Sequence, residues 1–277
     1  MSIRLLCFKT LHAIVVRLKI DSLKNQETYL KPVLLITGAS RGIGAATALL
    51  AAQNGWAVAV NYTQNALAAD DVVRQIRQAG GTAISVQGDV GHEDQILAMF
   101  AQVDAKLGRI RGLVNSAGIV DMTSRVDEMS WARVERMMRI NVLGSFACTR
   151  EAIRRMSTRH GGEGGVIVNL SSAAARLGAS GQYVDYAASK AAIDTLTLGV
   201  SKEVAAEGIR VNAVRPGVID TEIHGSGGLP NRAKELAPLI PMQRAGTAQE
   251  VAQTIVWLLS DASSYITGTC IDVTGGR

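Results

Sequence analysis

From Val33 to the last residue, short apolar runs alternate with longer segments in which apolar and polar residues mix at helical spacing. The short runs are rich in Val, Ile, Ala and Gly, which is typical of strands buried on both faces. We predict seven such strands, at residues 33–38, 56–62, 82–90, 110–118, 164–172, 209–217 and 269–276. We predict helices between them at residues 45–55, 68–81, 93–108, 131–159, 184–207 and 248–260.

This alternation predicts right-handed β-α-β units and therefore one parallel sheet with helices on both faces. The expected fold class is α/β, a single doubly wound, Rossmann-type domain over residues 32–277, because the connections leave no room for a second domain. A long irregular stretch runs from about 218 to 247. Such stretches in compact domains are usually functional, so we expect a substrate loop there.

Residues 1–31 differ from the rest, because several bases and no acid precede Asp21. Three interpretations stand. The segment is a targeting peptide, although it is poor in Ser and has no obvious cleavage site, or an amphipathic helix at a membrane interface, or a poorly ordered extension. We favour the extension, since chain ends are often poorly ordered unless they are tied down.

Composition narrows the classes of function. The formal net charge is +5, and the basic residues are scattered without interleaved aromatic residues, so nucleic-acid binding is not expected. No apolar run reaches the roughly 18 residues that span a membrane, so no membrane association is expected. Cys7, Cys148 and Cys270 are far apart and the four histidines are dispersed, which predicts neither disulfides nor a metal site. We expect a reduced, cytoplasmic protein.

The segment "ITGASRGIG" joins the first predicted strand to the first predicted helix, with its glycines spaced G-x3-G-x-G. A phosphate-binding loop requires this strand–turn–helix context. The helix N-terminus offers unpaired N–H groups, and glycines allow a pyrophosphate to approach the backbone. We expect this loop to bind a dinucleotide through Gly38, Ser40, Arg41, Gly42, Ile43 and Gly44.

The end of the second predicted strand bears on which dinucleotide is bound. NAD-binding units usually carry Asp or Glu there, which binds the ribose 2′-hydroxyl. Here the strand ends "VNYTQN", where Asn61, Tyr62 and Thr63 are neutral, and Arg41 in the loop can pair with a 2′-phosphate. We therefore expect NADP (NADPH) rather than NAD, with Asn61 among the cofactor contacts.

A second group of candidate residues follows a later strand. Tyr186 and Lys190 are four residues apart in a predicted helix and so share a face. The pKa of a free Tyr is about 10, and we expect the neighbouring ammonium to lower it toward neutrality. The preceding strand ends "NLSS" at the carboxyl edge of the sheet, where open α/β sheets bind ligands. Alone, the pair would be an ordinary surface pair; the loop and the strand-end Ser make it a candidate active site.

Over residues 33–277 the chain resembles the short-chain dehydrogenase/reductase family. "TGASRGIG" is similar to the family's cofactor loop TG-x3-G-x-G and "YAASK" to its catalytic pair Y-x3-K. "INVLGSF" is similar to its Asn motif, and "VRPGVIDTE" to the P-G segment after its sixth strand.

The resemblance implies roles for four residues. Tyr186 would be the acid/base, and Lys190 would lower its pKa and bind the nicotinamide ribose. Ser172 would orient the carbonyl, and Asn141 would hold a water in a proton relay. Ser172 is chosen over Ser171 as the second Ser of its pair, although the fourteen positions that separate it from Tyr186 exceed the commonest family spacing by one.

The resemblance also implies cofactor contacts outside the loop. Asp89 and Val90 would lie at the adenine ring. The remaining contacts would line the groove and the nicotinamide end: Asn115, Ala117, Gly118, Tyr186, Lys190, Pro216, Gly217, Val218 and Thr221. The family's usual N-N-A-G is "NSAG" here, and we expect Ser116 to have only a modest structural effect.

The implied function is an NADP(H)-dependent oxidoreductase that transfers a hydride between the nicotinamide and a carbonyl or secondary alcohol. The chain is similar to bacterial oxidoreductases of the 3-oxoacyl-carrier-protein reductase and glucose 1-dehydrogenase type. Two alternatives stay open, an NAD(P)-dependent sugar dehydrogenase and a non-catalytic NADP-binding regulator. The family also implies a homotetramer or homodimer. An acyl-carrier substrate would need a basic docking patch, but we interpret Arg133, Arg136 and Arg139 as a solvated helix face.

Overall fold

The computed structural model describes residues 31–277, apart from the side chains of His224 and Ser226. The interpretations of the N-terminal extension concern residues that, except for Lys31, lie outside the described part of the chain. Residues Pro32–Arg277 form one compact unit.

Within the described residues, seven parallel strands form one sheet in the order β3-β2-β1-β4-β5-β6-β7. The strands are β1 (Val33–Thr37), β2 (Ala57–Tyr62), β3 (Thr82–Gln87), β4 (Ile110–Asn115), β5 (Gly165–Leu170), β6 (Ile209–Pro216) and β7 (Cys270–Val273). Each predicted strand is present, so the predicted doubly wound α/β class is confirmed. The strand order reverses between β1 and β4, and ligands of such sheets bind at this point, beyond the carboxyl ends of the strands.

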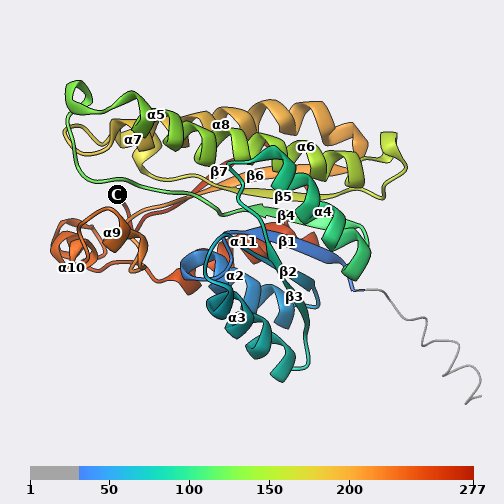
Figure 1. The fold of residues 1–277 in the computed structure, drawn as a ribbon. Coiled ribbons are helices and arrows are strands. Elements are labelled where there is room, and N and C mark those ends of the chain that lie inside the picture. Colours follow the sequence, from blue (N-terminus) through green and yellow to red (C-terminus); the bar gives the residue numbers. More distant parts are fainter. Residues whose placement is uncertain (1–30) are drawn as a thin grey trace, which may run out of the picture. The chain divides into compact units, whose positions relative to one another are not determined.

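Helices form a layer on each side of the sheet (Figure 1). One layer holds α2 (Gly42–Gln53), α3 (Ala66–Gln78) and α11 (Ala248–Leu259). The other holds α4 (Glu93–Leu107), α5 (Trp131–Met138), α6 (Gly144–Met156) and α8 (Val184–Val204). Polar side chains cap the N-termini of two of these helices. Asn65 accepts a hydrogen bond from the Ala68 amide at the start of α3, and Thr247 and Glu250 form a capping box at the start of α11.

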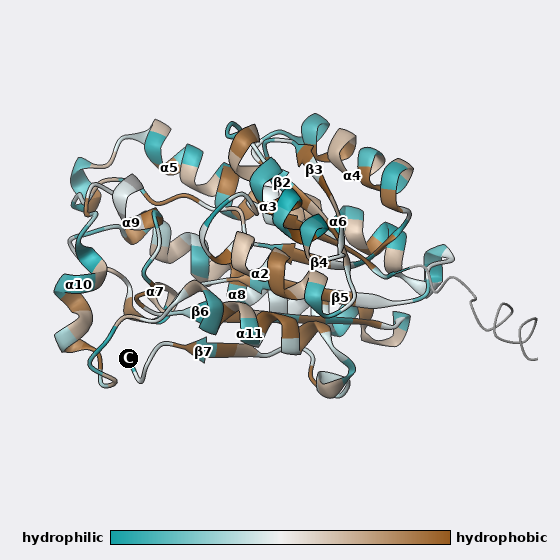
Figure 2. Ribbon diagram, turned by 90° about the horizontal axis from the view of Figure 1, so that it is seen from below, coloured by the Kyte–Doolittle hydropathy of each residue, from teal (hydrophilic) through white to brown (hydrophobic). Residues whose placement is uncertain are grey.

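The two layers share the apolar side chains of the central strands. On β1, Leu34 and Ile36 pack with α2, α3 and α11, whereas Val33 and Leu35 pack with the opposite layer, and all four are buried. Burying each such side chain stabilises the fold by about 1.5–3 kcal/mol. Figure 2 shows the resulting pattern, with hydrophobic colour concentrated on the inner strands and hydrophilic colour on outward helix faces.

Two segments differ from the prediction. The helix predicted over 131–159 is divided, because a π-helical turn, η2 (Arg139–Leu143), separates α5 from α6. Such turns are frequently found at functional sites. The segment after β6 contains short helices, α9 (Ile223–Ser226), α10 (Arg232–Leu236) and η5 (Ala237–Leu239), where the sequence indicated an irregular loop. A further short helix, α7 (Ala174–Leu177), lies between β5 and α8.

Candidate active site

The glycine loop follows β1 and lies against the end of β4. Gly38 has a φ of +63°, and a Cβ on it would approach the Ala117 Cα to 2.8 Å, so only glycine fits here. Thr37 fixes the same contact, because its Oγ1 accepts hydrogen bonds from the amides of Ser116 (3.1 Å) and Ala117 (3.0 Å). The loop is thereby held at the point where the strand order reverses.

The same loop opens helix α2 in a way that suits a pyrophosphate. A Cβ on Gly44 would lie 2.4 Å from the Gly38 carbonyl oxygen, so the loop folds back tightly on the first helical turn. No side chain caps α2, and its first turn carries no acid. Its N-terminal N–H groups and partial positive charge are therefore available to an anion. Ser40 is half-buried and Arg41 is exposed beside this helix end.

Asn61 lies beneath the loop. It is buried, its Oδ1 accepts a hydrogen bond from the Gly38 amide (3.0 Å), and its Nδ2 donates to the Gly88 carbonyl (2.9 Å). The side chain thus joins the first loop to the one after β3, and its polar atoms are used inside the protein. The neutral residues left at the end of β2 are Tyr62, which is half-buried, and Thr63, which is exposed.

Of the other residues expected in the cofactor groove, some line a cavity and others hold neighbouring segments together inside the protein. Asp89 is half-buried, and its Oδ1 accepts from the Gly91 amide (2.8 Å), while Val90 is buried against Gly144. Asn115 is buried, and its Nδ2 donates to Thr149 Oγ1 (3.1 Å) and Asn169 Oδ1 (2.9 Å). Asn115 therefore braces the sheet from within, while Gly118 lines the cavity described below.

Asn141 occupies the middle of the π-helical turn. Its Oδ1 accepts from the Ile119 amide (2.8 Å), and its Nδ2 donates to the Ile119 carbonyl (3.0 Å) and to Ser189 Oγ (3.1 Å). It is 1% exposed. The turn after β4 and helix α8 are joined through this one amide.

Lys190 is buried in α8 and reaches the end of β5, where its Nζ donates to the Leu170 carbonyl (2.6 Å). Burial lowers the pKa of Lys190 from 10.5 to about 8, and the charge of Asp194 offsets part of the effect. A Cβ on Gly118 would lie 3.4 Å from Asn141 Oδ1 and 3.5 Å from Lys190 Nζ. The two polar groups therefore converge on one small space beside Gly118.

Tyr186 and Ser172 form the polar face of the cavity. The hydrogen bond with Ser172 lowers the pKa of Tyr186, but burial has the larger effect and raises it above the ordinary value of 10. The expectation that Lys190 lowers the Tyr186 pKa is not met, because the Lys190 Nζ lies 5.7 Å from the Tyr186 ring centroid and bonds to Leu170 instead. The neighbouring Ser171 is buried and donates to the Lys190 carbonyl (3.1 Å), so it holds α8 against β5.

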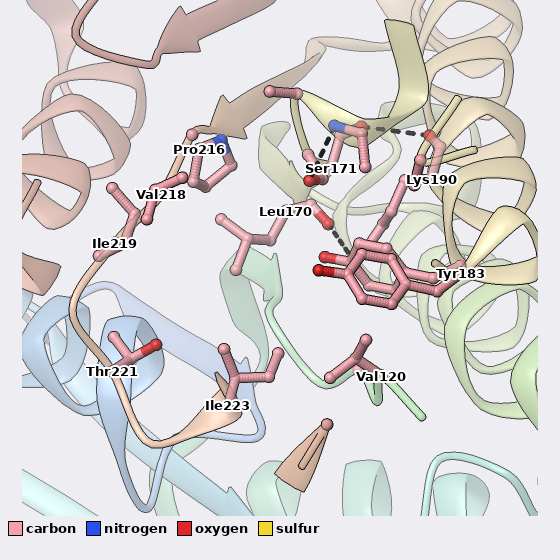
Figure 3. Close-up of a pocket in the computed structure, with 18 of the residues that line it drawn as sticks. Val120, Leu170, Ser171, Tyr183, Lys190, Pro216, Val218, Ile219, Thr221 and Ile223 are labelled. Carbon is pink, nitrogen blue, oxygen red and sulfur yellow. Dashed lines mark hydrogen bonds between the residues drawn. The ribbon is translucent and has the colours of Figure 1, made fainter. Parts of the chain in front are cut away.

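A cavity of about 190 Å³ lies at the carboxyl ends of β4, β5 and β6. It brings together nine of the predicted site residues, namely Ile43, Gly118, Ser172, Tyr186, Lys190, Pro216, Gly217, Val218 and Thr221. Figure 3 shows Val218, Ile219, Thr221 and Ile223 facing Tyr183 and Leu170 across this space. None of Asn61, Asn115 and Asn141 lines this cavity: Asn141 holds Ile119 in the turn after β4, and Asn61 holds the glycine loop at Gly38.

Several residues of the site escaped the sequence analysis. Thr37, Ser189 and the Leu170 carbonyl act through contacts between distant segments, which no spacing along the chain reveals. Tyr183, which directly precedes α8, and Arg232 of α10 also line the cavity. Tyr183 is not helical, and nothing in the sequence indicated that its ring lies beside Tyr186.

Arg133 departs from the expected solvated helix face. Its side chain is 12% exposed and pairs with Asp185, which is 1% exposed. Arg136 is 54% exposed and Arg139 is also exposed, so the interpretation as a solvated helix face holds for these two residues.

Between residues 31 and 277, no helix is long and apolar enough to cross a bilayer, and no three His, Cys, Asp or Glu side chains gather as metal ligands.

The fold and the site are typical of oxidoreductases that use a dinucleotide cofactor: they combine one parallel sheet, a glycine loop where the strand order reverses, and a cavity lined by Ser172, Tyr186 and Lys190. The chain belongs to the short-chain dehydrogenase/reductase family. A family model described as enoyl-(acyl carrier protein) reductase matches residues 38–277. The chain is 56% identical over 245 residues to an uncharacterized oxidoreductase, YgfF, of Escherichia coli (strain K12), covering 88% of this chain and 99% of that relative.

Two further similarities agree with this membership. A 3-oxoacyl-(acyl-carrier-protein) reductase of Synechocystis is 40% identical over 247 residues, which cover 88% of this chain and 96% of the relative. The solved structure of a short-chain dehydrogenase/reductase from Serratia marcescens is 31% identical, with a TM-score of 0.81 over 88% of this chain and 97% of that one.

Proposed function

We propose that the protein is an NADP(H)-dependent oxidoreductase that interconverts a carbonyl compound and the corresponding secondary alcohol, with Tyr186 as acid/base. The observation that carries the proposal is the convergence of Ser172, Tyr186 and Lys190 on one cavity beside a glycine loop. The bound nicotinamide supplies or accepts the hydride at the substrate carbon. The chain supplies orientation and one proton.

In reduction, the substrate carbonyl oxygen lies between the hydroxyls of Ser172 and Tyr186. Ser172 donates a hydrogen bond that holds the oxygen in place as negative charge develops on it. Tyr186 then gives its phenolic proton to that oxygen, so that carbonyl, hydride and proton together make the alcohol. Burial keeps the pKa of Tyr186 above 10, and a phenol that stays protonated at neutral pH suits a proton donor.

We assign the return of the proton lost by Tyr186 to Lys190, whose Nζ lies 5.7 Å from the centroid of the Tyr186 ring. Lys190 and Asn141 converge beside Gly118, and Asn141 donates to Ser189, which donates to the backbone carbonyl of Tyr186 (2.7 Å) and so holds this part of α8 in place. Lys190, with a pKa of about 8, can release a proton near neutral pH. A water held between Lys190 and Asn141 would complete the relay.

The choice of NADP(H) rests on charge near the end of β2. Thr63 and Arg41 are exposed there, and the nearest acids have other partners. Asp70 accepts from Ser85 Oγ (2.7 Å), and Asp71 pairs with Arg74. The end of β2 itself carries Asn61, Tyr62 and Thr63 and no acid, whereas NAD-binding units usually have there the Asp or Glu that binds the ribose 2′-hydroxyl.

The cavity lining argues against the alternative of a sugar dehydrogenase. A free sugar needs several polar partners, whereas most side chains outside the catalytic group are apolar, among them Val120, Leu177, Ile219 and Leu229. A regulator without activity is disfavoured because the four residues with proposed catalytic roles, Asn141, Ser172, Tyr186 and Lys190, are all present.

Two exposed aromatic side chains support a homodimer or homotetramer. Trp131 on α5 and Phe146 on α6 are exposed, and large exposed apolar side chains on neighbouring helices often mark an interface between subunits.

The experiment that tests the proposal is a screen of purified protein against ketones, sugars and acyl thioesters. Each substrate is offered with NADPH and with NADH, and the corresponding alcohols with NADP and NAD. The proposal expects carbonyl reduction with NADPH and a weaker rate with NADH. Activity confined to sugars, or a strong preference for NADH, would contradict it.

A further inference from the structure

Arg232 brings a positive charge to the cavity beside the proposed acid/base. Its guanidinium carbon lies 5.2 Å from the centroid of the Tyr183 ring, and its Nη2 donates to Gln182 Oε1 (2.7 Å). The Tyr183 ring in turn meets the Tyr186 ring edge to face, with centroids 6.0 Å apart. The guanidinium is therefore one aromatic ring removed from Tyr186, at the far end of the same cavity.

Arg232 has no Asp or Glu partner in the described part of the chain. Among residues 31–277, with the side chains of His224 and Ser226 set aside, no Asp or Glu lies within 4.0 Å of its guanidinium, although Arg133, Arg155 and Arg215 each have an acidic partner. Arg remains charged at any working pH and has five N–H donors in a planar fork. Gln182 uses one of these donors, so the others remain available to a bidentate anion.

The rest of the cavity fits an anion with an apolar body. Among the described residues no Asp or Glu side chain lines it, whereas Lys190 and Arg232 do. Lys190 is engaged at the Tyr186 end through the Leu170 carbonyl. The wall between the two ends is mostly apolar, with Val120, Leu170, Leu177, Val218, Ile219 and Leu229.

Resting on the proposed function, we propose that the substrate is an oxo- or hydroxycarboxylic acid with an apolar body. Its carbonyl or hydroxyl carbon lies at Ser172 and Tyr186, and its carboxylate pairs with the guanidinium of Arg232. A carboxylate accepts two parallel N–H bonds from the guanidinium fork, which fixes the substrate's orientation as well as its affinity. Specificity for the acid follows, because a neutral substrate would leave this charge unpaired.

A purely structural role is the competing account of Arg232. Its contacts with Tyr183 and Gln182 also fasten α10 to the start of α8, and such a fastening needs no ligand. The two accounts differ in what they predict for charge. If Arg232 only holds the two helices together, replacing it changes the affinities for acids and esters equally. If Arg232 binds an anion, replacing it changes the ratio of these two affinities.

Isothermal titration calorimetry on the NADP-saturated protein tests the proposal without any turnover. The probes are cyclohexanecarboxylate and its neutral methyl ester. The variants are Arg232→Met, which removes the charge, and Arg232→Lys, which keeps it. Lys234→Met is the matched control, because Lys234 is exposed on the same short helix and does not line the cavity.

We expect the native protein to bind the acid at least about 10-fold more tightly than the ester, since charged hydrogen bonds contribute this much or more. Arg232→Met should reduce that preference by roughly 10- to 100-fold, Arg232→Lys should keep part of it, and Lys234→Met should keep all of it. Equal binding of the two probes, no binding of either, or an unchanged preference in Arg232→Met overturns the proposal. Reduction of neutral ketones and its dependence on Tyr186 are measured separately, so the proposed function can stand when this inference fails.

Discussion

Asn61 and Gly38 are joined by a hydrogen bond of 3.0 Å, from the glycine amide to the Asn61 Oδ1. The other end of the same side chain donates to the Gly88 carbonyl at 2.9 Å. One buried amide therefore holds two of the loops that border the expected dinucleotide site. This relationship gives Asn61 a positioning role, in which it shapes the loop from below.

Replacing Asn61 with Leu should weaken both the fold and cofactor binding. The Gly38 amide and the Gly88 carbonyl would each lose a buried partner, which costs about 1–3 kcal/mol per group in unfolding free energy. We expect the Kd for NADPH to rise about 10-fold because the loop is no longer held. Asn65→Ala is the control: it removes the α3 cap, costs about 1 kcal/mol, and leaves NADPH affinity unchanged. Equal NADPH affinity in Asn61→Leu and Asn65→Ala would refute the positioning role.

The lowered pKa of Lys190 predicts a stability that rises at alkaline pH. Below about pH 8 Lys190 is protonated in both states, and its burial is a constant cost. Between about 8 and 10.5 the unfolded chain holds a proton that the folded chain has released, so unfolding becomes harder as pH rises. Relative to Lys190→Met, the native protein should gain about 3 kcal/mol across this window.

Urea denaturation at several pH values measures this gain. Lys202→Met serves as the control: Lys202 is exposed on the same helix, and this variant retains Lys190, so its stability should rise with pH as in the native protein. A pH dependence shared by the Lys190 and Lys202 variants would show that another group is responsible.

The buried ion pair of Arg133 and Asp185 should stabilise the start of α8. Arg133 Nε lies 2.8 Å from Asp185 Oδ2, and Asp185 Oδ1 accepts from the Tyr186 amide at 2.9 Å. Arg133→Met would leave a buried carboxylate without its partner, at a cost of about 3–5 kcal/mol. Arg125→Met breaks an exposed pair with Asp127 and should cost under about 1 kcal/mol. Thermal unfolding measures the fall in Tm of each variant. Equal falls in Tm would mean that the buried pair contributes no more stability than the exposed pair.

Much of the fold was predictable because the strands are buried on both faces. Val33, Leu34, Leu35 and Ile36 read as one apolar run, and the alternation of such runs with amphipathic segments leaves few topologies. The division of the helix at Arg139–Leu143 was not predictable, since those residues carry no Pro or Gly and continue the helical pattern. Tertiary contacts of Asn141 with Ile119 and Ser189 accompany the extra residue in that turn.

Site residues were predictable where their spacing along a helix places reactive side chains on one face. They were not predictable where the role of a residue depends on the direction in which its side chain points. Tyr186 and Lys190 share a helical face by spacing alone. Asn61, by contrast, ends a strand whose side chains alternate in direction, and the sequence does not say that its amide turns under the loop. Arg232 lies 46 residues after Tyr186, and only the folded segment after β6 brings it to the Tyr183 ring.

Arg41 should set the preference between the two dinucleotides. It is exposed at the N-terminus of α2, where it can pair with a 2′-phosphate that NADPH has and NADH lacks. Arg41→Ala should reduce the ratio of kcat/KM for NADPH over NADH about 10-fold. The control is Lys106→Ala, which removes an exposed positive charge on α4 that is not among the expected cofactor contacts. An unchanged ratio in Arg41→Ala would mean that selectivity lies elsewhere.

The most direct test of the central claim is the Tyr186→Phe variant. Phe keeps the ring and its packing against Tyr183 but has no proton to give, so NADPH should still bind, as measured by its fluorescence. With the best substrate of the screen, carbonyl reduction should fall by about 10²- to 10⁴-fold. A rate equal to that of the native protein would contradict Tyr186 as the acid/base and, with it, the proposed mechanism.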